Sequence, residues 1–72
     1  MKSINHLVIS DPEILSGMPV FKGTRVPART LFDYLEAGNH RDEFLDDFPT
    51  VTREQAVELL KVVRENLAPA FV

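Results

Sequence analysis

The chain has no cysteine and no tryptophan, and only one of its 72 residues is a tyrosine. Without cysteine it has no disulfide framework, no thiolate nucleophile and no cysteine-based zinc site. No stretch approaches the ~18 consecutive apolar residues that a membrane span needs. We therefore expect a cytoplasmic protein that does not contact membranes.

The chain is also short for a stable core, because a domain of this size buries only about 60% of its unfolded surface. This length excludes a two-domain enzyme. The composition, with 44% hydrophobic and 26% charged residues, is that of an ordinary globular chain. We expect one domain over residues 1–72, and we expect a homodimer to supplement so small a core.

Positive charge is not in excess, since the net charge is −3 and the isoelectric point is near 5.2. This balance argues against indiscriminate nucleic-acid binding. The charges are unevenly distributed, however. Residues 22–29 contain three cations and no acid, whereas residues 40–48 contain Arg41 among four acids. The chain therefore has a basic segment and an acidic segment.

The sequence contains no pattern typical of an enzyme or a metal site. The segment from Gly17 to Gly23-Thr24 is one residue too long for a phosphate-binding loop and has no lysine after its second glycine. His6 and His40 are not spaced as a pair of metal ligands. The acids lack the alternating, glycine-containing pattern of a calcium loop. We predict a protein that is not an enzyme and uses no cofactor or metal.

Short strands are predicted in the N-terminal part. Residues 6–10 are rich in β-branched and apolar side chains and precede Asp11-Pro12, which is typical of a strand followed by a turn. Residues 13–17 are a connector or a single helical turn. Two apolar runs flank Lys22-Gly23, at residues 19–21 and 24–26. This pattern predicts a tight hairpin in which Gly23 has a positive φ.

From Pro27 onward the apolar residues recur at helical spacing. A first helix is predicted over residues 27–37, with Gly38 just beyond its end. Asn39 is predicted to cap a second helix that Pro49 ends. The predicted core positions of this second helix are Phe44, Leu45 and Phe48.

Thr52 and Gln55 have the spacing of a capping box, which predicts the start of a third helix that ends at Pro69. Its predicted core positions are Ala56, Leu59, Leu60, Val63 and Leu67. The elements together predict an α+β fold. Short N-terminal strands with a hairpin, over residues 1–26, precede three helices in a helix-turn-helix-like bundle over residues 27–68.

The connection between the second and third helices is only three residues long, and so short a turn suits the steep crossing of a helix-turn-helix. The third helix would then be the recognition helix. Arg53, near its start, is placed to contact a base edge, and Lys61 and Arg64 on the same side are placed to contact phosphates. The alternative is a solvated helix face whose ion pairs contribute only tenths of a kcal/mol each.

Two further cations, Lys22 and Arg25, would reach the flanking DNA backbone from the predicted hairpin. The alternative is that they protect a strand edge from aggregation. The acidic face of the second helix counts against DNA binding, because a phosphate backbone would repel it. We predict instead that this face, or the apolar C-terminal tail, helps to hold a protein partner. The predicted partner-binding residues are Asp42, Glu43, Asp46, Asp47, Phe71 and Val72.

Several motifs of the chain occur in the same order in one known family. They are Asp11-Pro12-Glu13-Ile14, the run Gly17-Met18-Pro19-Val20-Phe21-Lys22-Gly23-Thr24-Arg25-Val26-Pro27, Gly38, and Phe48-Pro49-Thr50-Val51-Thr52. From about Ile9 to Val63 the chain resembles the domain of unknown function 433 family. It departs from the family pattern at Met18, where a basic residue is common, and at Ala28, where valine is usual.

This resemblance implies a relationship to VapB-type antitoxins, a helix-turn-helix-like C-terminal half, and a neighbouring PIN-like ribonuclease as the toxin. We therefore expect an antitoxin-type adaptor that neutralises such a toxin and, as a dimer, binds its own operator DNA. Two alternatives remain open: a stand-alone helix-turn-helix transcription regulator and a purely structural interaction module.

Overall fold

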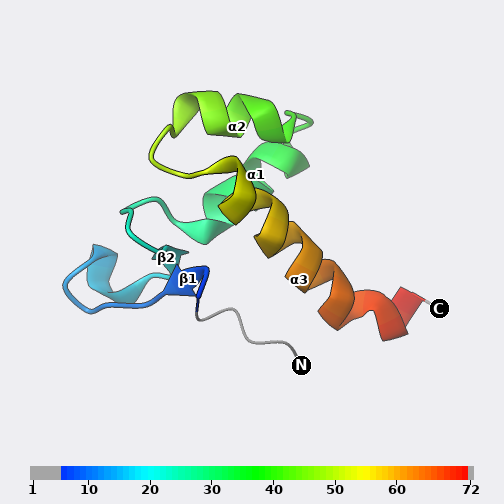
Figure 1. The fold of residues 1–72 in the computed structure, drawn as a ribbon, viewed down its shortest axis with the longest axis horizontal. Helices are drawn as coiled ribbons and strands as arrows, with labels where there is room; N and C mark the ends of the chain where they lie inside the picture. The colour runs from blue at the N-terminus through cyan, green and yellow to red at the C-terminus, as the bar shows by residue number, and fades with distance from the viewer. Residues whose placement is uncertain (1–5, 72) are drawn as a thin grey trace.

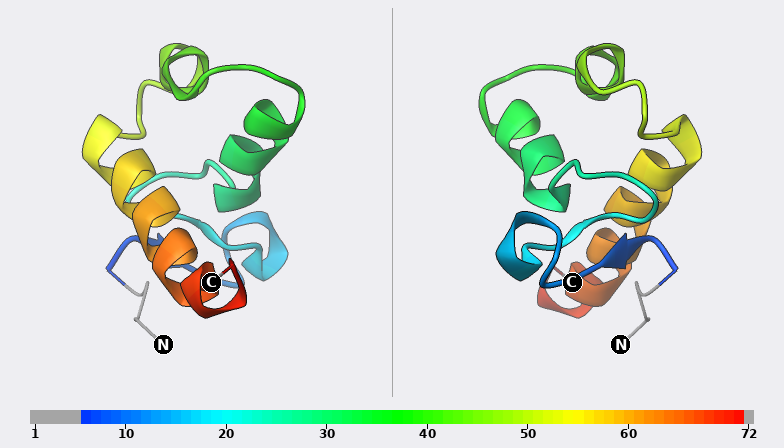
Figure 2. Two further views of the ribbon diagram at one scale, coloured as in Figure 1. Left: turned by 90° about the vertical axis from the view of Figure 1, so that its right-hand side faces the viewer. Right: turned by 90° about the vertical axis from the view of Figure 1, so that its left-hand side faces the viewer.

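The computed structural model describes the backbone of residues 6–71 and the side chains of residues 6–67 (Figure 1). Two short strands, β1 (Val8–Ile9) and β2 (Val20–Phe21), flank a 3-10 turn, η1 (Leu15–Gly17). Three helices follow, α1 (Ala28–Glu36), α2 (Arg41–Asp47) and α3 (Arg53–Phe71). In the side views α2 crosses above α1 and α3, and the strands lie at the opposite end (Figure 2). The predicted α+β class, with short strands before three helices, is confirmed.

The two strands pair antiparallel, with Val8 opposite Phe21 and Ile9 opposite Val20. On its other edge β2 meets the chain that leads into α1, where Val20 forms an isolated bridge to Pro27. The prediction of a second hairpin strand over residues 24–26 is therefore wrong, because β2 takes β1 as its strand partner. Proline has no N–H to extend a ladder, and the next residue already begins α1.

The predicted turn at Lys22-Gly23 is present. The Thr24 N–H donates to the Phe21 carbonyl at 3.0 Å, and Gly23 has a φ of +81°. The Thr24 hydroxyl donates to the same carbonyl at 2.8 Å and accepts the Val26 N–H at 3.0 Å. The threonine side chain thus holds the chain on the far side of the turn.

The junction between α1 and α2 differs from the prediction. The Gly38 N–H donates to the Leu35 carbonyl and the Asn39 N–H to the Tyr34 carbonyl, at 3.1 and 2.9 Å. These two bonds, with a positive φ at Gly38, are the Schellman ending of α1. Asn39 therefore belongs to the end of α1, and the cap of α2 is His40 rather than Asn39.

The start of α3 is as predicted, and its end is not. The Gln55 N–H donates to Thr52 Oγ1 at 3.1 Å, and the Thr52 N–H donates to Gln55 Oε1 at 2.9 Å. These reciprocal bonds confirm the capping box. The predicted end at Pro69 is wrong, because α3 continues to Phe71. Proline has a helical φ, and although it lacks an N–H and crowds the carbonyl four residues earlier, Pro69 lies only two residues from the end of α3.

The core lies where the strands and the three helices meet. Its fully buried large side chains are Val20, Phe21, Leu31 and Phe44. From α3 the buried residues are Ala56, Leu59 and Val62, so Val62 is a core residue that the prediction missed. Leu67, predicted to be in the core, is 47% exposed. The second half of α3 extends past the other helices, so none of the described helices or strands covers that position (Figure 1).

Among residues 6–71, no helix combines the length and the apolar character that a membrane span needs.

Candidate functional site

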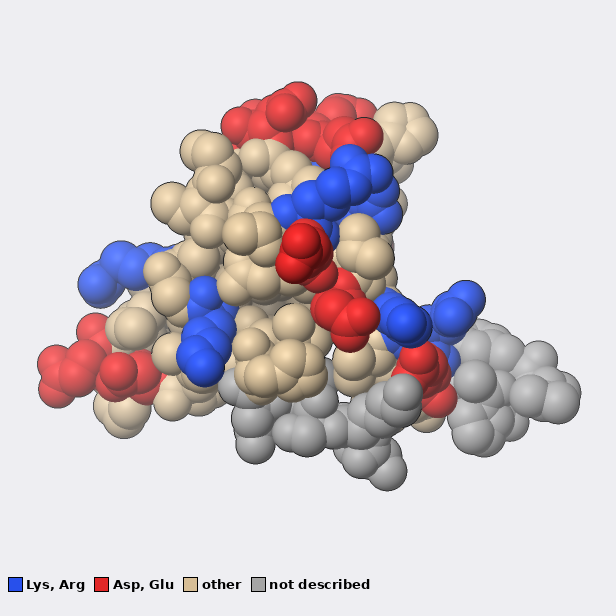
Figure 3. Space-filling view, viewed as in Figure 1, with Lys and Arg blue, Asp and Glu red and all other residues tan. Residues whose placement is uncertain are grey.

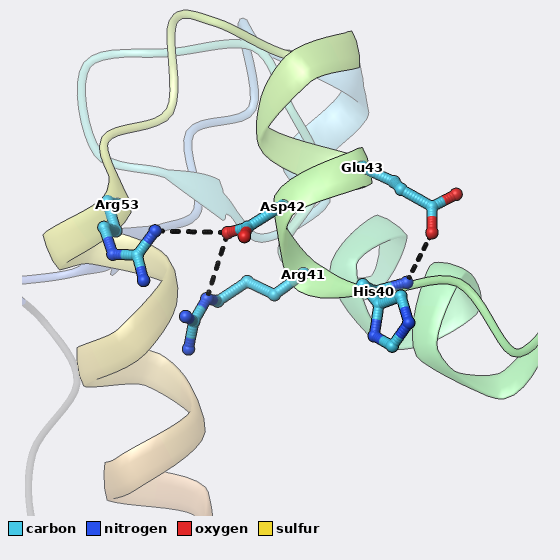
Figure 4. Close-up of polar contacts among 5 residues, drawn as sticks. All are labelled: His40, Arg41, Asp42, Glu43 and Arg53. Atoms are coloured by element: carbon cyan, nitrogen blue, oxygen red, sulfur yellow. Dashed lines mark hydrogen bonds and ion pairs between the residues drawn. The ribbon is translucent and has the colours of Figure 1, made fainter.

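Arg53, the predicted base-contacting residue, is paired with an acid of α2. Its Nη1 lies 3.1 Å from Asp42 Oδ1, and Arg41 Nε lies 3.9 Å from the same oxygen (Figure 4). The side chains of Arg53 and Asp42 are 64% and 68% exposed. A pair this exposed contributes about 0.2–1 kcal/mol. The ion pair directs the Arg53 side chain toward α2. Because the pair is weak, a phosphate group could replace Asp42 as the partner of Arg53.

Lys61 and Arg64 lie on the exposed side of α3, as predicted. In the part of the chain that the structure describes, neither of them makes an ion pair or a side-chain hydrogen bond. The structure adds a third cation, Arg41, which shares with them a surface hollow of about 300 Å³. Arg41 is not among the site residues predicted from the sequence. Its only signal was that it is the single cation in an acidic segment.

Lys22 and Arg25 lie elsewhere, at the turn after β2. Gln55 Nε2 donates to the Lys22 carbonyl at 2.9 Å, so the turn is attached to the first turn of α3. Arg25 borders a separate, mostly apolar hollow of about 540 Å³, which Ile9, Ile14 and Val26 also line. The predicted DNA-binding residues therefore form two groups, one at this turn and one along α3. The sequence did not indicate that Gln55 joins the turn to the helix.

The acids of α2 gather on one exposed face, at the top of Figure 3. Three of its four acids have partners within the chain. Asp42 pairs with Arg53, Glu43 Oε1 accepts the His40 N–H at 3.1 Å, and Asp47 Oδ2 accepts the Tyr34 hydroxyl at 2.5 Å. Asp46 alone has no such partner among the described residues. Asp42 and Asp47 meet donors on other helices, whereas Glu43 bonds to the N-cap of its own helix.

The other predicted partner-binding residues, Phe71 and Val72, are not among the side chains that the structure describes. Within residues 6–71, no three histidine, aspartate or glutamate side chains are grouped so that they could hold a metal ion.

Residues 8–61 match the family described as "Protein of unknown function (DUF433)". The chain belongs to this family. It is also 33% identical over 55 residues to "Uncharacterized protein y4eO" of Sinorhizobium fredii (strain NBRC 101917 / NGR234). That alignment covers 76% of this chain and 25% of the relative, so the chain spans about a quarter of the relative's length. No solved structure matches the chain.

The DUF433 match extends from β1 to the middle of α3 and ends at Lys61. It therefore contains the Lys22-Gly23 turn, the capping box of α3 and all of α2. Arg64 and the extended second half of α3 lie beyond it. Most of the core of this DUF433 domain is within the family match, whereas the core residues Leu7 and Val62 and part of the cationic surface lie outside it.

The contact between α1 and α2 predicts an altered titration of Tyr34. The hydrogen bond to Asp47 raises the pKa of Tyr34 above its ordinary value of 10.0, and partial burial and the negative charges of Asp47 and Glu43 act in the same direction. The raised pKa means that this contact stabilises the fold at neutral pH. That contribution is lost as the pH rises through the pKa of the folded state.

Because Tyr34 is the only tyrosine, the ultraviolet absorbance of phenolate reports on it alone. We expect Asp47→Ala to move the titration midpoint down toward 10.0, the ordinary value, and Asp46→Ala to leave it in place. Equal midpoints in the Asp47→Ala variant and the unmodified chain would contradict the contact.

Proposed function

We propose that this DUF433 chain is an antitoxin-type adaptor of the cytoplasm. It neutralises a PIN-like ribonuclease toxin through the acidic face of α2 and, as a homodimer, binds its own operator DNA through α3. The observation that carries the proposal is the uneven distribution of charge. The exposed acids of α2 gather at one end of the molecule (Figure 3), whereas α3 carries Lys61 and Arg64, which have no ion-pair partner among the described residues, together with acids of its own.

The acidic face supports the protein-binding role. An enzyme that cleaves RNA needs a cationic surface to hold its substrate, and an exposed carboxylate face is complementary to such a surface. Three of the acids are already held in place by Arg53, His40 and Tyr34. A partner would therefore meet a preorganised surface and would order fewer side chains on binding.

The α2–α3 arrangement supports the DNA-binding role. Lys61 and Arg64 are exposed and have no ion pair with the described residues, and Gln55 holds the Lys22 turn against the start of α3. A stand-alone transcription regulator is the second candidate, and these same cations favour it. DNA binding with no dependence on a co-expressed partner would select the regulator. Binding of neither partner nor DNA would leave a structural interaction module.

The test of the adaptor is co-purification with the protein encoded by the adjoining reading frame. Because Asp46 has no partner in the part of the chain that the structure describes, we expect Asp46→Lys to leave the fold intact, slow association with the toxin and reduce the salt dependence of association. Glu13→Lys makes the same charge change in the loop before β2 and is expected to bind as the unmodified chain does. Identical association rates for the two variants would remove α2 as the toxin-binding face.

A further inference from the structure

The hollow between α2 and α3 is lined by three cations, and none of the described residues that line it is acidic. Arg41, the first residue of α2, forms one side, and Lys61 and Arg64 of α3 form the other, with Val57 and Leu60 as the apolar lining. Lys61 and Arg64 are three residues apart, so their side chains project from the same face of the helix. Residues from two helices therefore converge on one positively charged hollow, which we name the cationic groove.

The cations of the groove make few ion pairs or hydrogen bonds with the described residues. Lys61 and Arg64 have no ionic partner among the described residues. Arg41 Nε is shielded from solvent and has no hydrogen bond, because Asp42 Oδ1 is 3.9 Å away and is shared with Arg53. Figure 4 shows the Arg41 side chain reaching from α2 toward α3. A shielded N–H without an acceptor is unfavourable, so an anionic oxygen that entered the groove would relieve it.

The lining favours a phosphate backbone over an acidic peptide. Leu60 packs against the core, which leaves Val57 as the one well-exposed apolar residue of the groove. Val57 alone offers little apolar surface for a peptide side chain. The aliphatic parts of the lysine and arginine side chains explain the remaining apolar surface of the groove, so that surface does not indicate an apolar ligand. Arginine, in contrast, has planar donors that match phosphate oxygens.

We propose that the cationic groove binds the phosphodiester backbone of duplex DNA through Arg41, Lys61 and Arg64. The inference rests on the DNA-binding part of the proposed function. It adds Arg41 as a binding residue and specifies that the groove contacts the phosphates of the DNA backbone. Backbone contacts carry no sequence information, so this groove provides affinity and orientation rather than base recognition. Arg53, held by Asp42 at the start of α3, lies outside the groove's lining.

The test is a salt titration of binding to a fluorescently labelled duplex of random sequence, measured by anisotropy. We compare the unmodified chain with Arg41→Gln, Lys61→Gln and Arg64→Gln. Each variant is expected to lower the slope of log affinity against log salt by about 0.9, so that the loss of affinity between 50 and 200 mM salt shrinks about 3.5-fold. Arg41→Lys keeps the charge and is expected to retain the slope.

Arg29→Gln is the matched control, because Arg29 is exposed on α1, pairs with Asp33 and does not line the groove. Unchanged slopes in all three groove variants would overturn the groove and leave DNA binding by another surface in place. Failure of the unmodified chain to bind the duplex at low salt would overturn both the groove and the DNA-binding role, while the co-purification test of the adaptor would stand. Competition by polyglutamate as effective as that by DNA would assign the groove to an acidic protein and overturn the inference.

Discussion

Phe44→Ala is expected to remove most of the stability of the fold. Phe44 is fully buried on α2, and its ring centroid lies 5.9 Å from that of Phe21, 5.5 Å from that of Tyr34 and 5.2 Å from that of Phe48. This one ring therefore connects β2, α1 and α2. Truncation of a buried phenylalanine to alanine costs about 3–5 kcal/mol. The total stability of a domain of this size is about 4–11 kcal/mol.

Urea unfolding followed by circular dichroism measures this loss. Leu67→Ala is the matched control, because it also truncates an apolar side chain but at an exposed position of α3. We expect its free energy of unfolding to stay within about 0.5 kcal/mol of that of the unmodified chain. Equal losses in the two variants would show that Leu67 is covered in the folded protein.

Gly23→Val is expected to have the second largest effect, through the backbone rather than through a clash. A Cβ at this position would have no atom within 4 Å, but Gly23 has a φ of +81°. A β-branched residue in the left-handed region is strained, and such strain costs about 1–3 kcal/mol. Because Gln55 bonds to the Lys22 carbonyl, a distorted turn would also loosen the attachment of α3.

Thermal melts of two controls separate this mechanism from a general effect of the substitution. Lys22→Val places the same side chain on the neighbouring turn residue, which has no positive φ, and is expected to melt near the unmodified chain. The melting temperature of Gly23→Asn is expected to lie between those of Gly23→Val and the unmodified chain, since asparagine tolerates the left-handed region. A melting temperature of Gly23→Val equal to that of Lys22→Val would exclude backbone strain as the cause.

Local patterns predicted the elements because their causes are local. The Thr52–Gln55 capping box, the glycine at Lys22-Gly23 and the glycine after α1 each act within a few residues along the chain. Where two local signals competed, the prediction failed. Asparagine is a favourable N-cap residue, but the Asn39 N–H bonds to the Tyr34 carbonyl in the ending of α1. The N-cap of α2 is therefore the next residue, His40.

The sequence predicted the buried face of α3 only in part: Ala56 and Leu59 are buried as expected, but Val62 was missed and Leu67 is exposed. Apolar residues occupy a wide arc of this helix, and several choices of core face fit the helical period. The surrounding elements select Ala56, Leu59 and Val62, and because they cover only the first half of the helix, Leu67 remains exposed. The predicted second strand of the hairpin failed for a related reason, since β1, eleven or more residues earlier, pairs with β2 instead.

By itself the sequence determined the α+β class, the order of the elements, the turn at Gly23 and the exposed cations Lys61 and Arg64, because propensities, capping and periodicity depend on neighbours in the chain. Only the tertiary structure decided which charges meet. It placed Asp42 against Arg53, Asp47 against Tyr34, and Arg41 beside the α3 cations. Ion pairs and grooves join residues of separate helices, and their formation depends on how those helices cross, which no local pattern encodes.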